Sequence, residues 1–134
     1  MRMRYLTMGV IAVTLLGSCG DGQTGPKVPV PGALTFELQT PNAQEGALLI
    51  QLSGPGLTAA AVSTTGSSNQ AFARMSGSAL KIAVFGTIPA GPVFNIRVPD
   101  LARASEYTAT VTEVSDTGNN LRVSLTGYAV RVKR

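Results

Sequence analysis

The sequence of 134 residues contains no histidine, no tryptophan and a single cysteine. The absence of histidine removes the commonest general base and metal ligand, and it excludes a Ser-His-Asp triad. The absence of tryptophan removes the largest side chain for aromatic stacking. A lone cysteine cannot form an internal disulfide, so a folded domain must be held together by its core. We therefore expect no catalytic residues, no cofactor and no metal site.

Charged residues are also scarce, at 13% of the chain, whereas 44% of the residues are hydrophobic. Part of this hydrophobic content lies at the N-terminus, where Arg2 and Arg4 precede an apolar run over residues 6–16. The run is shorter than the about 20 residues that a membrane-spanning helix needs. A positive start, a short apolar middle and small residues at the end are typical of a secretory signal peptide.

The single cysteine lies at the end of this segment, in the sequence Leu16-Gly17-Ser18-Cys19. These four residues resemble the lipobox of bacterial lipoproteins, in which an aliphatic residue and two small residues precede the cysteine. The resemblance implies a signal peptide over residues 1–18, cleavage before Cys19, and a lipid on its thiol that anchors the protein in a membrane. Stable anchoring takes two signals, such as two acyl chains. The alternative is an ordinary secreted protein with a cysteine near its cleavage site.

The residue after the cysteine bears on the compartment. In the lipoprotein family, an Asp directly after the cysteine is linked to retention in the inner membrane, whereas Gly20 stands there in this sequence. The resemblance therefore implies the bacterial cell envelope, with the outer membrane favoured over the inner one. Whether the domain faces the periplasm or the cell surface stays open.

A linker follows the cysteine. Residues 20–32, GDGQTGPKVPVPG, contain four glycines and three prolines. This composition predicts a tether whose second half is stiffer because of its prolines, so residues 19–32 form the lipidated cysteine and a Pro/Gly tether. Its maximum reach is roughly 40 Å at about 3.3 Å per residue.

The rest of the chain, residues 33–134, predicts strands. Apolar and polar residues alternate with a period of two, which is typical of half-buried strands separated by turns. The runs are residues 34–38, 48–52, 80–84, 94–98, 107–111, 121–125 and 128–132, with turns at residues 41–42, 54–56, 86–92 and 116–120. Because the last two runs are out of phase, Thr126-Gly127 is expected to form a bulge or tight bend within one long strand. Seven short strands predict a single all-β domain, an immunoglobulin-like antiparallel two-sheet β-sandwich.

Two local patterns support a sandwich. Residues 95–114 resemble the corner between two strands of fibronectin type III domains, where a Leu lies six residues before a Tyr; Leu101 and Tyr107 have this spacing. The resemblance implies that the Tyr107 ring packs inside and its hydroxyl bonds to upstream backbone, although Arg103 stands where the family has Pro. Residues 86–98 more loosely resemble a small-residue turn of cohesin domains. Neither pattern implies a function.

The polar loops contain candidates for binding. Residues 63–70 form a polar loop with Ser67, Ser68 and Asn69, and residues 116–120 form a second with Asn119 and Asn120. One Asp and two Asn are too few for calcium, so we expect the second loop to be a turn. Asp100 precedes a possible helical turn over residues 101–105 and is expected to cap it.

Charge limits the class of partner. Without the signal peptide the chain has nine basic and seven acidic residues, a net charge of +2, which is too low for a nucleic-acid binder. Arg131 and Lys133 are expected on the outer face of the last strand, where they form either a solvated face or a weak patch for anionic lipid or acidic glycan.

These observations favour a non-enzymatic lipoprotein of the cell envelope whose sandwich holds or contacts an envelope protein. A module that binds a glycan or another small ligand through its loops is the alternative, and a hydrolase is the least supported class.

Overall fold

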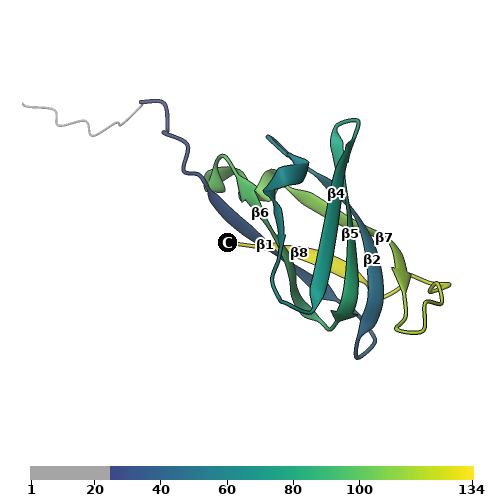
Figure 1. Cartoon of the computed structure of the whole chain (residues 1–134). Helices are drawn as coiled ribbons and strands as arrows, with labels where there is room; N and C mark the ends of the chain where they lie inside the picture. The colour runs from purple at the N-terminus through teal and green to yellow at the C-terminus, as the bar shows by residue number, and fades with distance from the viewer. Residues whose placement is uncertain (1–24) are drawn as a thin grey trace, which may run out of the picture.

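The computed structural model describes residues 25–134, so Cys19 and the expected signal peptide lie outside the described residues. The described chain forms eight strands and two short 3-10 helices (Figure 1). The strands are β1 (Gly32–Gln39), β2 (Glu45–Ser53), β3 (Val62–Thr64), β4 (Asn69–Ser76), β5 (Ala79–Ile88), β6 (Gly91–Val98), β7 (Thr108–Ser115) and β8 (Ala129–Lys133), and the helices are η1 (Ala59–Ala61) and η2 (Leu101–Glu106).

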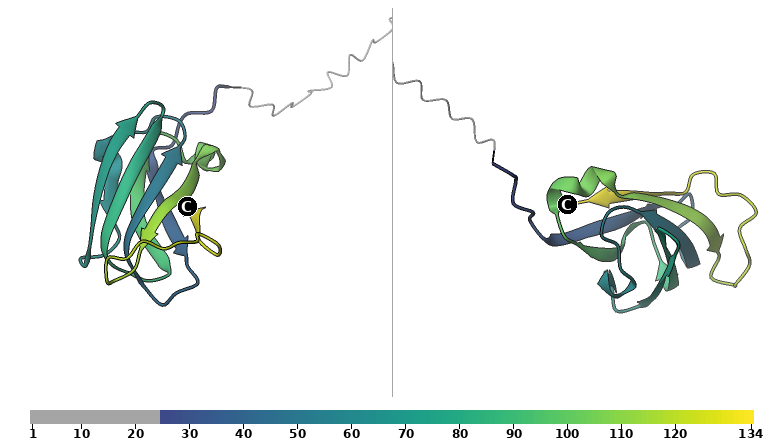
Figure 2. Two further views of the ribbon diagram at one scale, coloured as in Figure 1. Left: turned by 90° about the vertical axis from the view of Figure 1, so that its right-hand side faces the viewer. Right: turned by 90° about the horizontal axis from the view of Figure 1, so that it is seen from above.

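The strands form two antiparallel four-stranded sheets that pack face to face, which confirms the all-β two-sheet sandwich (Figure 2). One sheet has the order β3-β6-β1-β8 and the other has the order β4-β5-β2-β7. The pairs β1–β8, β2–β7, β3–β6 and β4–β5 alternate between the sheets, as in a jelly roll. In immunoglobulin domains the first two strands are neighbours in one sheet, whereas β1 and β2 lie in opposite sheets here.

The core fills the space between the sheets. Alternate residues of the central strands β1, β2, β5 and β6 are fully buried, and they are mostly Leu, Ile, Val and Phe. Phe36 of β1 and Phe94 of β6 stack at a ring-centroid distance of 4.8 Å with nearly parallel planes. Among the described residues, every member of this core lies between Leu34 and Val132.

The corner between β6 and β7 has the expected contacts. Tyr107 is buried, and its hydroxyl donates a hydrogen bond of 2.6 Å to the carbonyl oxygen of Pro55. That carbonyl is 52 residues upstream, in the connection after β2, so the bond ties two connections together. Asp100 caps η2 by accepting from the backbone N–H of Ala102, as expected.

The corner also holds the end of the tether. The carboxylate of Asp100 accepts a second hydrogen bond from the N–H of Val30, and the N–H of Leu101 donates to the carbonyl of Val30 at 2.8 Å. The tether is therefore fixed to the domain from Val30 onward.

Three expectations about strands were wrong. Residues 121–125 form no strand, apart from one bridge between Leu121 and Ser115. Thr126-Gly127 therefore bends the chain in a turn before β8, not within one long final strand. The expected loop at residues 63–70 contains the end of β3 and the start of β4. The expected turn at residues 86–92 is only two residues long, because β5 continues to Ile88 and β6 begins at Gly91.

No helix in the described part of the chain combines the length and the apolar character needed to cross a membrane.

Candidate functional site

The outer face of the β4-β5-β2-β7 sheet carries the most unusual surface of the described molecule. The register of the three strand pairings places its outward side chains in rows that run across the strands. The first row is Gln70, Phe85, Ala47 and Ser115; the second is Phe72, Ala83, Leu49 and Glu113; the third is Arg74, Lys81, Gln51 and Thr110. We call the six apolar residues Ala47, Leu49, Phe72, Ala83, Phe85 and Leu121 the apolar face.

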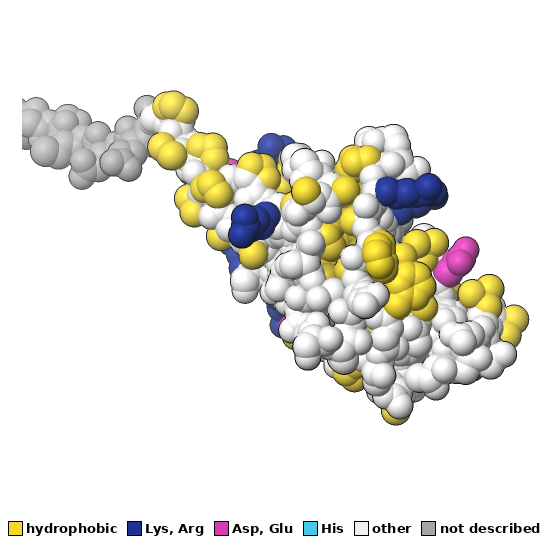
Figure 3. All heavy atoms as spheres, viewed as in Figure 1, with side chains coloured by type: hydrophobic (Ala, Val, Ile, Leu, Met, Phe, Trp, Pro, Cys, Tyr) yellow, Lys and Arg dark blue, Asp and Glu magenta, His cyan; other side chains and the backbone are white. Residues whose placement is uncertain are grey.

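Large side chains of the apolar face are open to solvent. Phe72 is 62% exposed, Phe85 48% and Leu121 66%. The two phenylalanine rings lie edge to face, with centroids 6.2 Å apart. Leu121 joins the face because its bridge to Ser115 extends the first row beyond the edge strand β7. Hydrophobic side chains gather on this side of the molecule in Figure 3.

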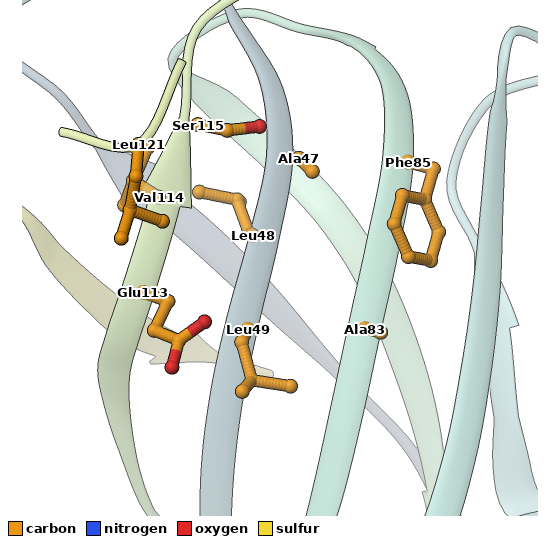
Figure 4. A pocket seen from close by; sticks show the side chains of 9 residues that line it. All are labelled: Ala47, Leu48, Leu49, Ala83, Phe85, Glu113, Val114, Ser115 and Leu121. Atoms are coloured by element: carbon orange, nitrogen blue, oxygen red, sulfur yellow. The ribbon is translucent and has the colours of Figure 1, made fainter. Parts of the chain in front are cut away.

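Two shallow hollows mark the apolar face, because Ala47 and Ala83 are small and their neighbours are large. The first has a volume of about 220 Å³ and lies between Leu49, Phe85 and Leu121 (Figure 4). The second has a volume of about 240 Å³ and is bordered by Leu49, Phe72 and Ala83. Both are smaller than the about 300–1,000 Å³ of typical small-molecule pockets.

Charged side chains border the apolar face. Arg74 and Lys81 lie opposite each other across β4 and β5 in the third row, and both line the second hollow. Glu113 lies on β7 at the far end of the second row. The face therefore has basic groups along one border and an acidic group at another, as Figure 3 also shows.

The loop residues predicted for binding do not come together. Ser67 and Ser68 lie in the exposed turn before β4, and Asn119 and Asn120 lie in the turn after β7. β4 and β7 are the two edges of their sheet, so three strand spacings, about 14 Å, separate the turns.

Hydrogen bonds within the chain occupy several of these side chains. When the side-chain amide of Asn69 is turned so that its nitrogen faces the neighbouring acceptors, it donates to the backbone carbonyls of Ser68 and Thr87. The carboxylate of Asp116 accepts from the backbone N–H groups of Gly118 and Asn120, which confirms the expected turn. These bonds form the turns themselves and do not point to a ligand.

A buried carboxylate, which the sequence analysis did not predict, lies at the end of the sandwich. Glu45 begins β2 and is fully buried. Its Oε1 accepts hydrogen bonds from Thr40 (2.9 Å), Asn42 (2.8 Å) and the Tyr128 hydroxyl (2.6 Å). Its Oε2 accepts from Arg122, with N–O distances of 3.1 Å for Nε and 3.0 Å for the terminal nitrogen.

These contacts determine what Glu45 can do. Burial raises the pKa of Glu45, but the hydrogen bonds from Tyr128, Asn42, Thr40 and Arg122 outweigh burial and hold the pKa below its ordinary value. Burial likewise raises the pKa of Tyr128, as does its bond to Glu45. A carboxylate that is ionised and fully bonded has no proton to donate and no open side for a substrate, so this cluster is structural.

Four other carboxylates, those of Glu37, Asp100, Glu106 and Asp116, are partly or fully exposed, and each has a hydrogen-bond or ion-pair partner. Glu106 accepts two hydrogen bonds from Arg103, which lowers the pKa of Glu106. Hydrogen bonds from the N–H groups of Ala102 and Val30 lower the pKa of Asp100. Among the described residues, no three acidic or thiol side chains are grouped as a metal site.

The outer face of the second sheet is different in character. Thr35 donates to Asn95, Glu37 lies 3.6 Å from Lys133, and Arg97 and Arg131 are exposed. Arg131 and Lys133 point outward, as predicted. Hence one side of the sandwich is polar, and the other carries the apolar face.

Comparisons with protein-family models, with curated proteins and with solved structures find no match to this chain. The function must therefore be argued from the surface itself. Sequence reasoning missed Phe72 and Phe85 as members of an exposed face, because their place on the sheet follows from the register between β4, β5 and β2, which no local pattern contains.

Proposed function

We propose that this protein is a lipid-anchored, non-catalytic binding module of the bacterial cell envelope, and that its apolar face docks a partner protein. The observation that carries the proposal is the contiguous set of exposed apolar side chains on the β4-β5-β2-β7 sheet. Exposed apolar patches of this kind, bordered by polar residues, mark interaction sites on soluble domains.

The shape of the face supports a protein partner over a small ligand. Its hollows are shallow and small, and apart from the border charges their lining is mainly Ala, Leu and Phe. A sugar needs hydrogen-bonding groups that fix its hydroxyls, and a small apolar ligand needs a deeper pocket. Protruding aliphatic or aromatic side chains of another protein fit shallow apolar hollows between aromatic neighbours.

The position of the face supports a partner away from the anchor. The tether joins the domain at the start of β1, and β1 runs to the opposite end of the sandwich before β2 begins there with Glu45 (Figure 1). Ala47 and Leu49 lie in the first half of β2, so the apolar face lies toward the end remote from the tether. With lipid on Cys19, the apolar face would lie at the end of the domain that is farther along the chain from the anchor.

The proposal can be tested with photo-crosslinking in cells of the native host. A photoreactive phenylalanine analogue replaces Phe85 on the apolar face or, as a control, Asn95 on the outer face of the other sheet. We expect one discrete protein adduct from position 85 that is absent from position 95. The same adducts from both positions, or none from position 85 in cells that display the anchored protein, would overturn the proposal. Adducts with glycan alone would favour the ligand-binding alternative.

A further inference from the structure

Two positive charges face each other at the border of the apolar face. Arg74 of β4 and Lys81 of β5 are direct cross-strand partners on the outer face of the sheet. Side chains in this relation have Cβ atoms about 4.5–5.5 Å apart, and like charges placed directly opposite each other destabilise a sheet. The pair therefore lowers the stability of the isolated domain.

No carboxylate of the described chain offsets this cost. The ion pairs formed by described residues are Arg103–Glu106, Arg122–Glu45 and Lys133–Glu37, and neither Arg74 nor Lys81 takes part in one. The acidic residue on the same face, Glu113, lies in the next row on β7, two strands from Lys81 and three from Arg74. At about 4.8 Å per strand and about 6.8 Å per row, its backbone lies roughly 12–16 Å from theirs, beyond contact.

The two cations are also part of a binding hollow. Arg74 and Lys81 line the second hollow together with Leu49, Phe72 and Ala83. A group that enters this hollow therefore meets apolar side chains on one side and two unpaired cations on the other.

We infer that the partner binds through a segment in which one or more carboxylates lie next to bulky apolar side chains. The apolar side chains fill the hollows, and the carboxylate lies between Arg74 and Lys81, where it converts their repulsion into two attractive contacts. This inference rests on the proposed function, and it adds the chemistry of the partner segment: acidic and hydrophobic. Glu113 at the far border disfavours a second carboxylate there, so the segment has a defined direction across the sheet.

A peptide-display selection on the isolated sandwich tests the inference. Residues 25–134 contain every core residue of the described structure, so this part is used in the assay. A library of random twelve-residue peptides is selected on it at low salt, and enriched peptides are synthesised for measurement of Kd. We expect Asp or Glu within four positions of Leu, Ile, Phe or Trp in the enriched peptides.

Substitutions of the two cations give the decisive comparison. Arg74→Gln and Lys81→Gln are each expected to weaken the peptide about tenfold, because each removes one charge-assisted contact. The matched control is Arg97→Gln, which removes the same charge from the outer face of the other sheet and should leave Kd unchanged. Affinity of the wild type should fall as salt is raised, and that of the double variant should fall less.

The outcomes separate the inference from the proposed function. If enriched peptides lose binding with Phe85→Ser but show no acidic preference and no effect of Arg74→Gln or Lys81→Gln, the inference is overturned while the docking face stands. If no peptide depends on Phe85, the proposed function fails as well. If the domain forms a dimer that dissociates with Glu113→Gln, the carboxylate between Arg74 and Lys81 is Glu113 of a second copy of this chain. That result would overturn the inference. Binding to phosphatidylglycerol vesicles that depends on Phe72 and Phe85 would overturn it in favour of a membrane.

Discussion

At the scale of single residues, Glu45 is the one charged side chain that is buried in the described molecule. It connects the β1–β2 turn, through Thr40 and Asn42, with the segment after β7, through Arg122 and Tyr128. None of the buried side-chain polar atoms in the described residues lacks a partner. The same contacts explain why residues 121–125 do not form the predicted strand. Arg122 turns inward to Glu45, whereas Leu121 and Val123 turn outward.

Glu45→Ala should destabilise the sandwich strongly. The substitution leaves the hydroxyl of Tyr128, the amide of Asn42 and the guanidinium of Arg122 without their acceptor. Removing one partner of a buried ion pair costs about 3–5 kcal/mol, and we expect the lower end because the Arg122 side chain is 31% exposed and can be rehydrated. Urea unfolding of the variant and the wild type measures the difference. A loss below about 1 kcal/mol would show that the cluster does not hold this end of the domain.

The pH dependence of stability should carry the signature of the same residue. The pKa of Glu45 is lower in the folded protein than its ordinary value of about 4.3, so its ionised form stabilises the fold above that pH. This stabilisation is lost as the pH falls through the folded pKa. Asp100, Glu106 and Asp116 also have lowered pKa values and contribute in the same direction. Unfolding free energies measured from pH 7 to pH 2.5 should therefore fall on acidification, and Glu45→Gln should flatten part of that fall.

At the scale of elements, the sequence predicted most of the core strands but not β4. The strands β1, β2, β5, β6, β7 and β8 were indicated by alternation of large apolar residues with polar ones. In β4 the pattern is inverted, because the small residues Ala71 and Ala73 face the core and Phe72 faces solvent. Residue types alone therefore gave no sign of the strand, and the apolar face was missed with it. Its rows depend on register across four strands, which no local pattern contains.

The attachment of β4 can be tested at Gly86 of β5. This residue has a φ of +139° and pairs with Asn69 at the start of β4. A Cβ added at Gly86 would overlap the backbone oxygen of Ser68, and side chains other than that of Gly rarely adopt such a φ. We expect Gly86→Ala to cost about 1–3 kcal/mol in unfolding free energy.

The matched control for this substitution is Gly66→Ala. Gly66 lies in the turn just before β4, has no positive φ and has open space where a Cβ would be added. Gly66→Ala should raise the free energy of unfolding by less than about 1 kcal/mol. Equal effects of the two substitutions would mean that the close approach of β5 to the start of β4 is not what restricts Gly86. Hydrogen exchange would in addition show faster exchange of the β4 amides in Gly86→Ala.

At the scale of the whole molecule, the two ends of the sandwich have different roles. The tether is fixed to the corner at η2 through Val30, and the apolar face lies toward the opposite end. In the described part of the chain, the core and the apolar face use only residues from Leu34 to Val132. We therefore expect anchoring through Cys19 and folding of the sandwich to be separable.

Cys19→Ser tests this separation. In cells of the native host, we expect the substitution to abolish incorporation of radiolabelled palmitate and to move the protein from the membrane fraction to the soluble fraction. We expect the unfolding temperature of the purified protein to stay the same, because the core residues in the described part of the chain all lie between Leu34 and Val132. Gly20→Asp is the companion variant: it keeps the lipid and should shift the protein from the outer toward the inner membrane. A Cys19→Ser protein that stays in the membrane fraction would refute the lipid anchor while leaving the docking face open to its own test, because crosslinking from position 85 does not require the lipid.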